Sequence, residues 1–139
     1  IYEPSSVKEP GCITEVSFPE VKSKTENSAT GICVVQKNGR TDYILSSDNP
    51  TDICTSGKMS AQATYALWGN KKGDDCTFFL GHGTLLSTPN VVIKTETPTD
   101  VLLEFKKGAW YYTASTDCTI SIKKKTYKLK ANMEEKILK

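Results

Sequence analysis

The chain contains one histidine, His82, which lies between two glycines. An imidazole can act as a general base, or it can activate a neighbouring thiol. Gly-x-Gly between two strands is also ordinary turn chemistry, because glycine adopts backbone angles that other residues avoid. A single histidine excludes the HExxH motif and other His-rich metal sites. We therefore predict no catalytic residue, no metal site and no cofactor in this chain.

Two groups of acidic side chains could in principle take part in hydrolysis or bind calcium. Asp74 and Asp75 are adjacent, whereas the two carboxylates of a glycosidase must face each other across a cleft, about 5–9.5 Å apart. Asp48, Asn49 and Asp52 form an oxygen-rich stretch without the D-x-D-x-D-G spacing of a calcium loop. We interpret both groups as exposed turn and loop residues.

Five cysteines are spread along the chain at nearly regular intervals. No two of them form a C-x-x-C pair, which argues against a zinc ribbon or thioredoxin-like chemistry. Alternate strands of one sheet lie about 9.6 Å apart, too far for a disulfide, so any bridge would have to cross between sheets. Buried free thiols and one or two disulfides both remain open, and with an odd number at least one cysteine stays outside any internal pair. The disulfide candidates are Cys12, Cys33, Cys54, Cys76 and Cys118.

Lysines are concentrated between residues 123 and 130, near the C-terminal end. If Lys124 and Lys125 form a hairpin turn, Lys128 and Lys130 point to one face, away from Leu129. Such a basic stripe could bind a sulfated or acidic polysaccharide, or it could keep an edge strand soluble and unpaired. We expect any ligand-binding surface to include these lysines and the neighbouring aromatic strand, although a tryptophan there can equally serve the core. The candidate residues are Lys123, Lys124, Lys125, Lys128, Lys130, Trp110 and Tyr112.

Short runs of β-branched and aromatic residues alternate with turn residues at a spacing of about ten residues. The clearest local signal is the hairpin within residues 31–46, where Asn38-Gly39 predicts a two-residue type I′ turn. The pattern predicts an all-β fold, an antiparallel β-sandwich, with a β-barrel as the alternative. The other expected strands are Cys12–Phe18, Ala63–Trp68, Cys76–Leu80, Thr84–Ser87, Val91–Thr95, Val101–Phe105, Ala109–Thr113, Cys118–Lys124 and Thr126–Lys130.

The length of 139 residues fits one domain, which we place at residues 11–139 behind an extended arm or linker at residues 1–10. Asn132 and Glu135 could cap a short C-terminal helix, or residues 135–139 could form a last edge strand. The net charge of +2 gives no reason to expect a nucleic-acid partner. No apolar run approaches the ~18 residues of a membrane span. Because the chain begins at Ile1 without a leader, we expect a trimmed, secreted product.

One stretch carries a family resemblance. Residues 62–68 read Gln-Ala-Thr-Tyr-Ala-Leu-Trp, residues 80–84 read Leu-Gly-His-Gly-Thr, and two short strands follow at 119–122 and 126–129. In this order, residues 62–131 resemble the C-terminal β-sandwich of heparinase II/III-like polysaccharide lyases. In those enzymes the reacting Tyr, His and Asn belong mainly to a helical toroid and a larger sheet, so no catalytic residue carries over.

The resemblance implies a non-catalytic accessory or binding module of an extracellular, carbohydrate-related protein, with an acidic or sulfated polysaccharide as partner. Two other classes of function remain open. One is a secreted protein-binding domain, such as an adhesin or a host-directed decoy, held by disulfides and bound to another protein or domain. The other is an enzyme in its own right.

Overall fold

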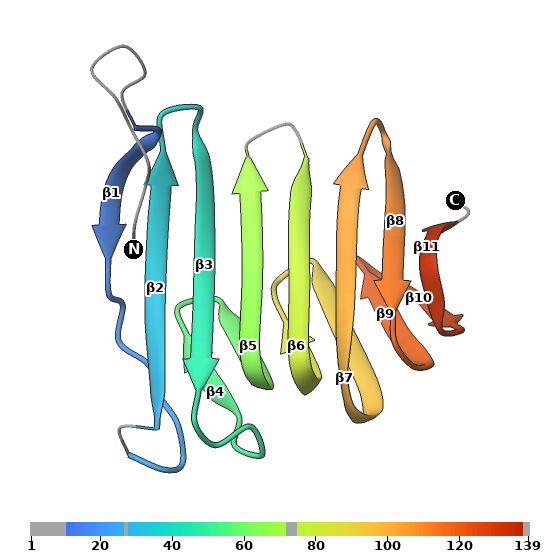
Figure 1. The fold of residues 1–139 in the computed structure, drawn as a ribbon, viewed down its shortest axis with the longest axis horizontal. Coiled ribbons are helices and arrows are strands. Elements are labelled where there is room, and N and C mark those ends of the chain that lie inside the picture. The colour runs from blue at the N-terminus through green and yellow to red at the C-terminus, as the bar shows by residue number, and fades with distance from the viewer. Residues whose placement is uncertain (1–10, 27, 72–74, 138–139) are drawn as a thin grey trace.

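The computed structural model describes residues 11–26, 28–71 and 75–137. The predicted arm at residues 1–10 lies outside these ranges. The described residues form antiparallel β-strands and no helix (Figure 1). The strands are β1 (Ile13–Ser17), β2 (Ala29–Gln36), β3 (Arg40–Ser47), β4 (Cys54–Ser56), β5 (Met59–Lys71), β6 (Cys76–Ser87), β7 (Val91–Lys106), β8 (Ala109–Ala114), β9 (Cys118–Ile122), β10 (Lys125–Leu129) and β11 (Asn132–Ile137).

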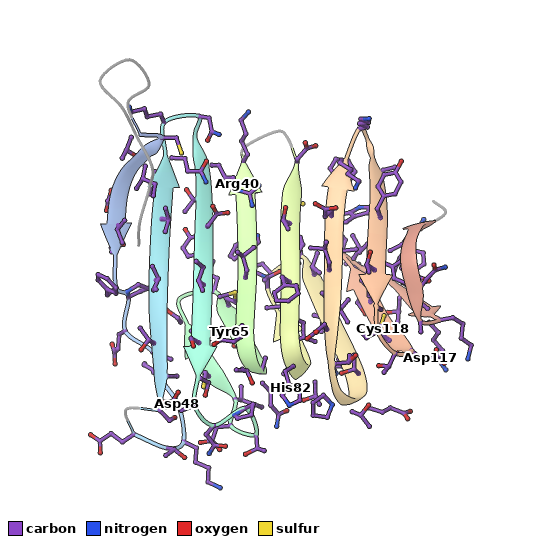
Figure 2. The ribbon with its side chains drawn as sticks, viewed as in Figure 1. Arg40, Asp48, Tyr65, His82, Asp117 and Cys118 are labelled. Carbon is purple, nitrogen blue, oxygen red and sulfur yellow. The ribbon has the colours of Figure 1, made fainter. Side chains whose placement is uncertain are left out.

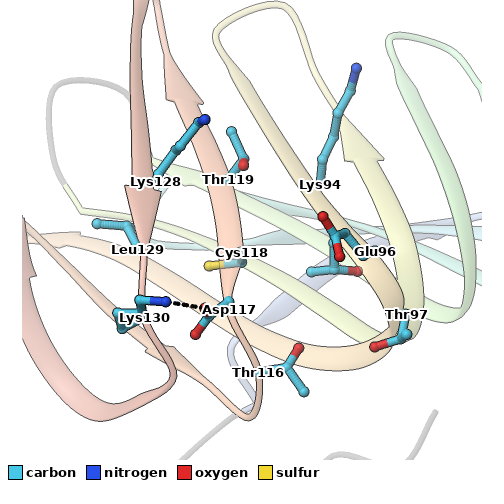
Figure 3. A pocket seen from close by; sticks show the side chains of 11 residues that line it. Lys94, Glu96, Thr97, Thr116, Asp117, Cys118, Thr119, Lys128, Leu129 and Lys130 are labelled. Atoms are coloured by element: carbon cyan, nitrogen blue, oxygen red, sulfur yellow. Dashed lines mark hydrogen bonds and ion pairs between the residues drawn. The ribbon is translucent and has the colours of Figure 1, made fainter.

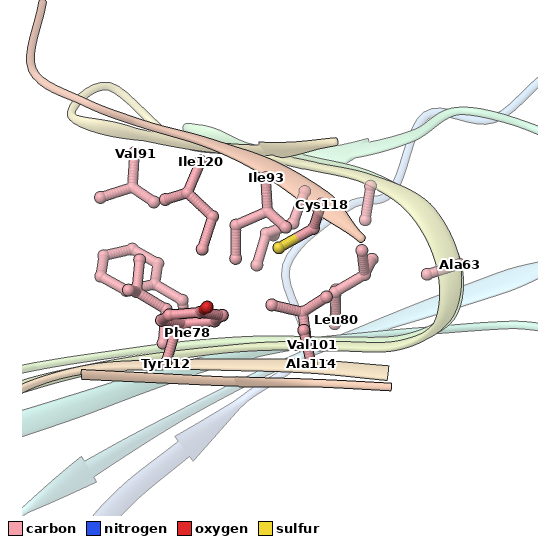
Figure 4. Close-up of a cluster of buried hydrophobic side chains, with 14 of the residues drawn as sticks. Ala63, Phe78, Leu80, Val91, Ile93, Val101, Tyr112, Ala114, Cys118 and Ile120 are labelled. Carbon is pink, nitrogen blue, oxygen red and sulfur yellow. The ribbon is translucent and has the colours of Figure 1, made fainter. Parts of the chain in front are cut away.

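The strands form two layers of a β-sandwich, and three long strands, β5, β6 and β7, run through both layers. The large layer has the order β1-β2-β3-β5-β6-β7-β8-β11. The small layer contains the other halves of the long strands, flanked by β4 on one side and by β9 and β10 on the other. Figure 4 shows the ribbon turning over from one layer to the other. The predicted antiparallel sandwich is confirmed, and the sheet is not closed into a barrel.

The bend of β6 lies at Gly81-His82-Gly83, where the pairing register shifts. A Cβ atom built on Gly83 would lie 2.3 Å from Cβ of Ala63 on β5, so only glycine lets the two strands approach this closely. His82 has a positive φ of 47°, and its backbone N–H donates to Oδ1 of Asp100 at 2.7 Å. The glycines therefore form a bulge inside one strand, where the sequence had predicted a turn between two strands.

Continuity of the long strands also corrects the expected element boundaries. The predicted strands Cys76–Leu80 and Thr84–Ser87 are the two halves of β6, and Val91–Thr95 and Val101–Phe105 are the two halves of β7. Pro98 lies between the halves of β7, which stays one strand through the bend. Turn residues thus mark bends in this fold as well as loops.

The β2–β3 hairpin is present, but its turn differs from the prediction. β2 ends at Gln36 and β3 begins at Arg40, so three residues connect them. Gly39 has a φ of 83° and donates its N–H to the carbonyl of Gln36 at 2.9 Å, while Asn38 keeps a negative φ. Oδ1 of Asn38 instead accepts the N–H of Arg40 at 2.9 Å. This geometry fits a type I turn followed by a glycine bulge, and the predicted two-residue type I′ turn is wrong.

The C-terminal strands settle two open expectations. The lysine hairpin turns at Lys123-Lys124, with Lys123 at a φ of 56°, and Lys125 already pairs with Ile122. The turn is therefore one residue earlier than predicted. The tail forms strand β11, which pairs with β8 and buries Ile137 in the core, so the helical alternative is wrong.

Alternation along the strands fills the space between the layers. Ile93 and Ile120 come from the small layer, and Leu80, Val101 and Leu103 come from the large one; all five are fully buried (Figure 4). Full burial of each such side chain contributes about 1.5–3 kcal/mol to folding. Trp110 also faces this interior, where its ring centroid lies 6.1 Å from that of Phe78.

The outer face of the large layer carries a row of apolar side chains across five neighbouring strands. Each is the register partner of the next, and each is half-buried by its neighbours. We call this the apolar row: Ile32, Ile44, Leu67, Phe79 and Leu102. β3, β5 and β6 are therefore apolar on both faces in their central parts.

Candidate functional site

The outer face of the small layer brings together lysines that lie far apart in the sequence. Lys94 on β7 is the register partner of Thr119 on β9, and Thr119 is the partner of Lys128 on β10. Their neighbours Ile93 and Ile120 point inward to the core, so these three side chains point outward. We call them the basic row. Figure 3 shows Lys94 and Lys128 extending on the same side of the strands with Thr119 between them.

An open groove of about 580 Å³ runs beside the basic row. Asp117 and Lys130 lie at one end of it, with the ammonium 2.6 Å from the carboxylate. Asp117 also accepts the backbone N–H of Ala131 at 3.1 Å. Charges of both signs line the groove, because Glu96 also contributes to it. The lining is Lys94, Thr95, Glu96, Thr97, Thr116, Asp117, Cys118, Thr119, Lys128, Leu129 and Lys130.

Three side chains of the groove have shifted pKa values: Asp117, Cys118 and Lys130. The hydrogen bond from Lys130 lowers the pKa of Asp117, and the same bond raises the pKa of Lys130. Burial raises the pKa of the Cys118 thiol to about 11, and the charge of Asp117 adds to this shift. Because a thiolate is the reactive form of cysteine, Cys118 is no nucleophile at neutral pH. The ammonium groups of Lys94 and Lys128 can bind anions.

Hydroxyl groups form a second row beside the basic row on the same face. The side chains are consecutive register partners across the small layer, apart from Val92, which lies between Ser87 and Ser121. Two pairs are hydrogen-bonded: Thr55 with Ser60, and Ser121 with Thr126, each at 2.9 Å. This face is thus polar and rich in groups that can bond to sugar hydroxyls. The hydroxyl row is Thr55, Ser60, Ser87, Ser121 and Thr126.

The residues predicted from the sequence are only partly brought together. Lys128 and Lys130 border the groove, and Lys123, Lys124 and Lys125 are exposed at the adjoining turn. Trp110 and Tyr112 lie on the inner face of the large layer instead. Tyr112 is 3% exposed, and its hydroxyl donates to the carbonyl of Lys130 at 3.0 Å. The structure thus makes Tyr112 a support of the lysine strand and separates both aromatics from the lysine surface.

Lys94 is the residue that the sequence did not reveal. It lies about 30 residues before the lysine cluster and joins it only because β7 pairs with β9. Hydrophobic alternation places Lys94 on the face opposite Ile93, but it does not indicate which strand lies beside β7.

The remaining polar candidates serve the fold. Figure 2 shows His82 at the bend end of β6, opposite the end where Arg40 lies. In the loop of residues 48–53, Oδ2 of Asp52 accepts the backbone N–H of Thr25 at 2.9 Å, so this carboxylate ties two loops together. Asp75 is exposed, and Asp74 lies outside the described residues. Within residues 11–26, 28–71 and 75–137, no group of three His, Cys, Asp or Glu side chains gathers as a metal site.

The five cysteines form no disulfide bond in the described structure. In the small layer, Cys54 on β4 and Cys118 on β9 are separated by β5, β6 and β7. In the large layer, β3 and β5 lie between Cys33 and Cys76. Several strand spacings of ~4.8 Å exceed the reach of a disulfide. The Cys54 thiol instead donates to the Ser47 hydroxyl at 3.6 Å. Disulfide stabilisation is therefore not supported.

Two antiparallel layers with a lysine-bearing polar face define the chain as a β-sandwich module. The family model of the endo-acting ulvan lyase C-terminal domain matches residues 19–105. The chain therefore belongs to this family. The expected relation to the C-terminal sandwich of a polysaccharide lyase is confirmed, and with it the assignment to carbohydrate-related proteins. The match includes Lys94 and ends at β7, before the lysine hairpin.

Neither the curated proteins nor the solved structures compared with the chain give a match. Across the residues that the structure describes, no helix has the length and hydropathy of a membrane span.

Proposed function

We propose that this domain is a non-catalytic, extracellular module that binds an acidic polysaccharide and so keeps a lyase on its polymer. The binding surface is the basic row together with the Lys123–Lys125 turn. The hydroxyl row beside it contributes hydrogen bonds to the sugar. Ulvan, which is named in the description of the family, is the first polysaccharide to test.

The observation that carries this proposal is the place of Lys94. Lysines on an edge strand are a common protection against edge-to-edge pairing, and β10, which carries Lys128, is such an edge. Lys94 lies on β7, which is paired on both sides within the small layer, with β6 and with β9. Edge protection therefore does not explain Lys94, whereas an anion-binding row across β7, β9 and β10 explains both lysines.

The strength of binding should depend on ionic strength. Each exposed ammonium contributes little alone, and the charges are screened over a Debye length of about 8 Å at physiological salt. Backbones two strands apart are separated by about 9.6 Å, so Lys94 and Lys128 can engage two different acidic groups of one polymer. Several such contacts along a polysaccharide add to one another, because the later contacts form within the same complex.

The test is the double substitution Lys94→Ser/Lys128→Ser, with binding measured on a heparin column and by affinity electrophoresis in ulvan. We expect affinity to fall about tenfold at physiological salt and the salt dependence to become shallower. The matched control is Lys37→Ser/Lys107→Ser, which removes the same charge from two exposed hairpin turns of the large layer. Equal losses in the two variants would show a general effect of net charge and would refute the surface proposed here.

A further inference from the structure

A second hollow lies at the open end of the sandwich, away from the basic row. It has a volume of about 280 Å³ and lies between β3, the β4–β5 turn and β5. The groove beside the basic row is instead built from β7, β9 and β10. The two hollows therefore share no strand. We call the second one the aromatic cleft; it is lined by Tyr43, Ser56, Gly57, Lys58, Met59 and Trp68.

Strand register brings two large aromatic rings to this cleft. Tyr43 and Trp68 are partners across β3 and β5, and their rings stack with centroids 5.2 Å apart at 27°. They lie on the inner face, two residues along from the core residues Leu45 and Ala66. Beyond β4 the small layer continues only through the bridge between Thr55 and Lys22, and Tyr43 remains 36% exposed. Packing against the core explains why Trp68 is partly buried, but it does not explain why the ring of Tyr43 beside it is exposed.

The second tryptophan shows what a purely structural ring looks like in this fold. Trp110 also lies on the inner face, and it packs against Phe105 at 5.1 Å between centroids as well as against Phe78. It borders neither of the two hollows. Both tryptophans are partly buried against the core, but only Trp68 lines an open cleft.

The cleft is apolar at its floor and polar at its rim. Met59, 1% exposed, forms an apolar floor. The Ser56 hydroxyl donates to the carbonyl of Glu20 at 3.1 Å, which fixes the strand at the base of the turn. Lys58, exposed at the tip of the β4–β5 turn, places a cation at the rim. Ligand sites combine such aromatic walls with a few polar groups that orient the ligand, and amphipathic rings suit ligands with both apolar and wet surfaces.

We infer that the aromatic cleft is a second carbohydrate subsite, which takes a single acidic pyranose unit. The sugar packs its C–H groups against the Tyr43–Trp68 pair and directs a carboxylate or sulfate toward Lys58. This inference rests on the proposed function, because it assigns a second contact to the same class of polysaccharide. A sugar in the cleft is bound by apolar contact together with the single charge of Lys58, whereas the basic row binds mainly by charge.

The two tryptophans allow the inference to be tested in the wild-type domain, because each indole reports on its own surroundings. In a ¹H–¹⁵N spectrum each indole N–H gives one signal, and Trp68→Phe assigns them. A heparin tetrasaccharide, which is acidic, should shift the Trp68 signal saturably and leave that of Trp110 in place. Cellotetraose, which is neutral, should shift it at least tenfold less at equal concentration. A Trp68 signal that does not move, or moves no more than that of Trp110, would overturn the inference.

Variants separate this inference from the function on which it rests. Tyr43→Ala and Lys58→Ser should each weaken the Trp68 response at least fivefold, while retention on heparin at low salt changes little. Lys94→Ser/Lys128→Ser should lose heparin retention and keep the Trp68 response. If the Trp68 signal stays fixed while the wild-type domain binds ulvan through the basic row, only the cleft is refuted. If the wild-type domain shows neither response, the proposed function fails together with the cleft.

Discussion

The two outer faces of the sandwich have opposite chemistry although the same three strands contribute to both. The small layer presents the basic row and the hydroxyl row, whereas the large layer presents the apolar row. The rows on both faces consist of register partners, so they differ in side-chain type. Rows across strands, rather than runs along the sequence, are the units that decide what a sheet surface does.

This contrast predicts that substitutions on the two faces separate stability from binding. Side chains of the apolar row are register partners and half-buried, so their removal should weaken the fold. Lysines of the basic row stand in solvent, so their removal should weaken only association with anions. The bend that places the two faces on opposite sides should be more sensitive than either face.

The largest effect is expected at that bend, for Gly83→Ala. The added Cβ atom would lie 2.3 Å from Cβ of Ala63 and 2.7 Å from the carbonyl oxygen of Gln62, and the latter is backbone that cannot rotate away. Overpacking of this kind costs about 1–3 kcal/mol or more. Urea unfolding followed by tryptophan fluorescence measures the loss.

Gly39→Ala is the control for this bend prediction. Gly39 has a φ of 83°, and a Cβ added there would meet no other atom within 4 Å. Alanine at this position should therefore lower the stability only through left-handed backbone strain, by about 1–2 kcal/mol. If Gly83→Ala unfolded at the same urea concentration as the wild type, the close approach of β5 and β6 at the bend would be refuted.

A smaller loss of stability is expected for Phe79→Ala in the apolar row. Phe79 is the register partner of Leu67 and Leu102, and its ring lies over the glycine at position 81, where an added Cβ would lie 2.8 Å from the ring. Because the side chain is half-buried, we expect a cost of about 1–2 kcal/mol and unchanged retention on heparin. A fall in heparin retention without a fall in stability would reverse the roles assigned to the two faces.

The strands themselves could be predicted from the sequence, and so could the sandwich, because alternation and turn residues are local signals. The lysine hairpin was also predictable, since β9 and β10 follow each other directly. The bends were not, because Gly81-His82-Gly83 and Pro98 read equally well as loops between separate strands. Lys94 was hidden for a related reason: the β7–β9 pairing skips β8, and no local pattern reports such a neighbour.

The smallest effect on binding is expected at the ion pair between Asp117 and Lys130, at one end of the groove. Lys130 is bound to Asp117, which lowers the pKa of that carboxyl from its ordinary 3.8. Asp117→Asn should release the ammonium and increase heparin affinity by about twofold at neutral pH, in line with the small worth of exposed pairs.

Acid should act in the same direction as this substitution. The contribution of the pair to stability is present above the ordinary carboxyl pKa and is lost as pH falls through the lowered one. Below that pH the wild type and Asp117→Asn should have equal affinity for sulfated polymer, which a titration on the heparin column measures. An affinity gap that persisted in acid would show that Asp117 acts on binding by some route other than its charge.

The sharing of β5, β6 and β7 between the layers has a consequence for how the domain comes apart. No cut through the sandwich separates one layer from the other without breaking these three strands. Their amide protons should exchange with solvent only through global opening, while those of β1 and β10 exchange through local fraying at the edges. Because β5, β6 and β7 also follow one another in the chain, their pairings close short loops and can form early in folding. The meander that shapes both faces is thus also expected to be the folding nucleus.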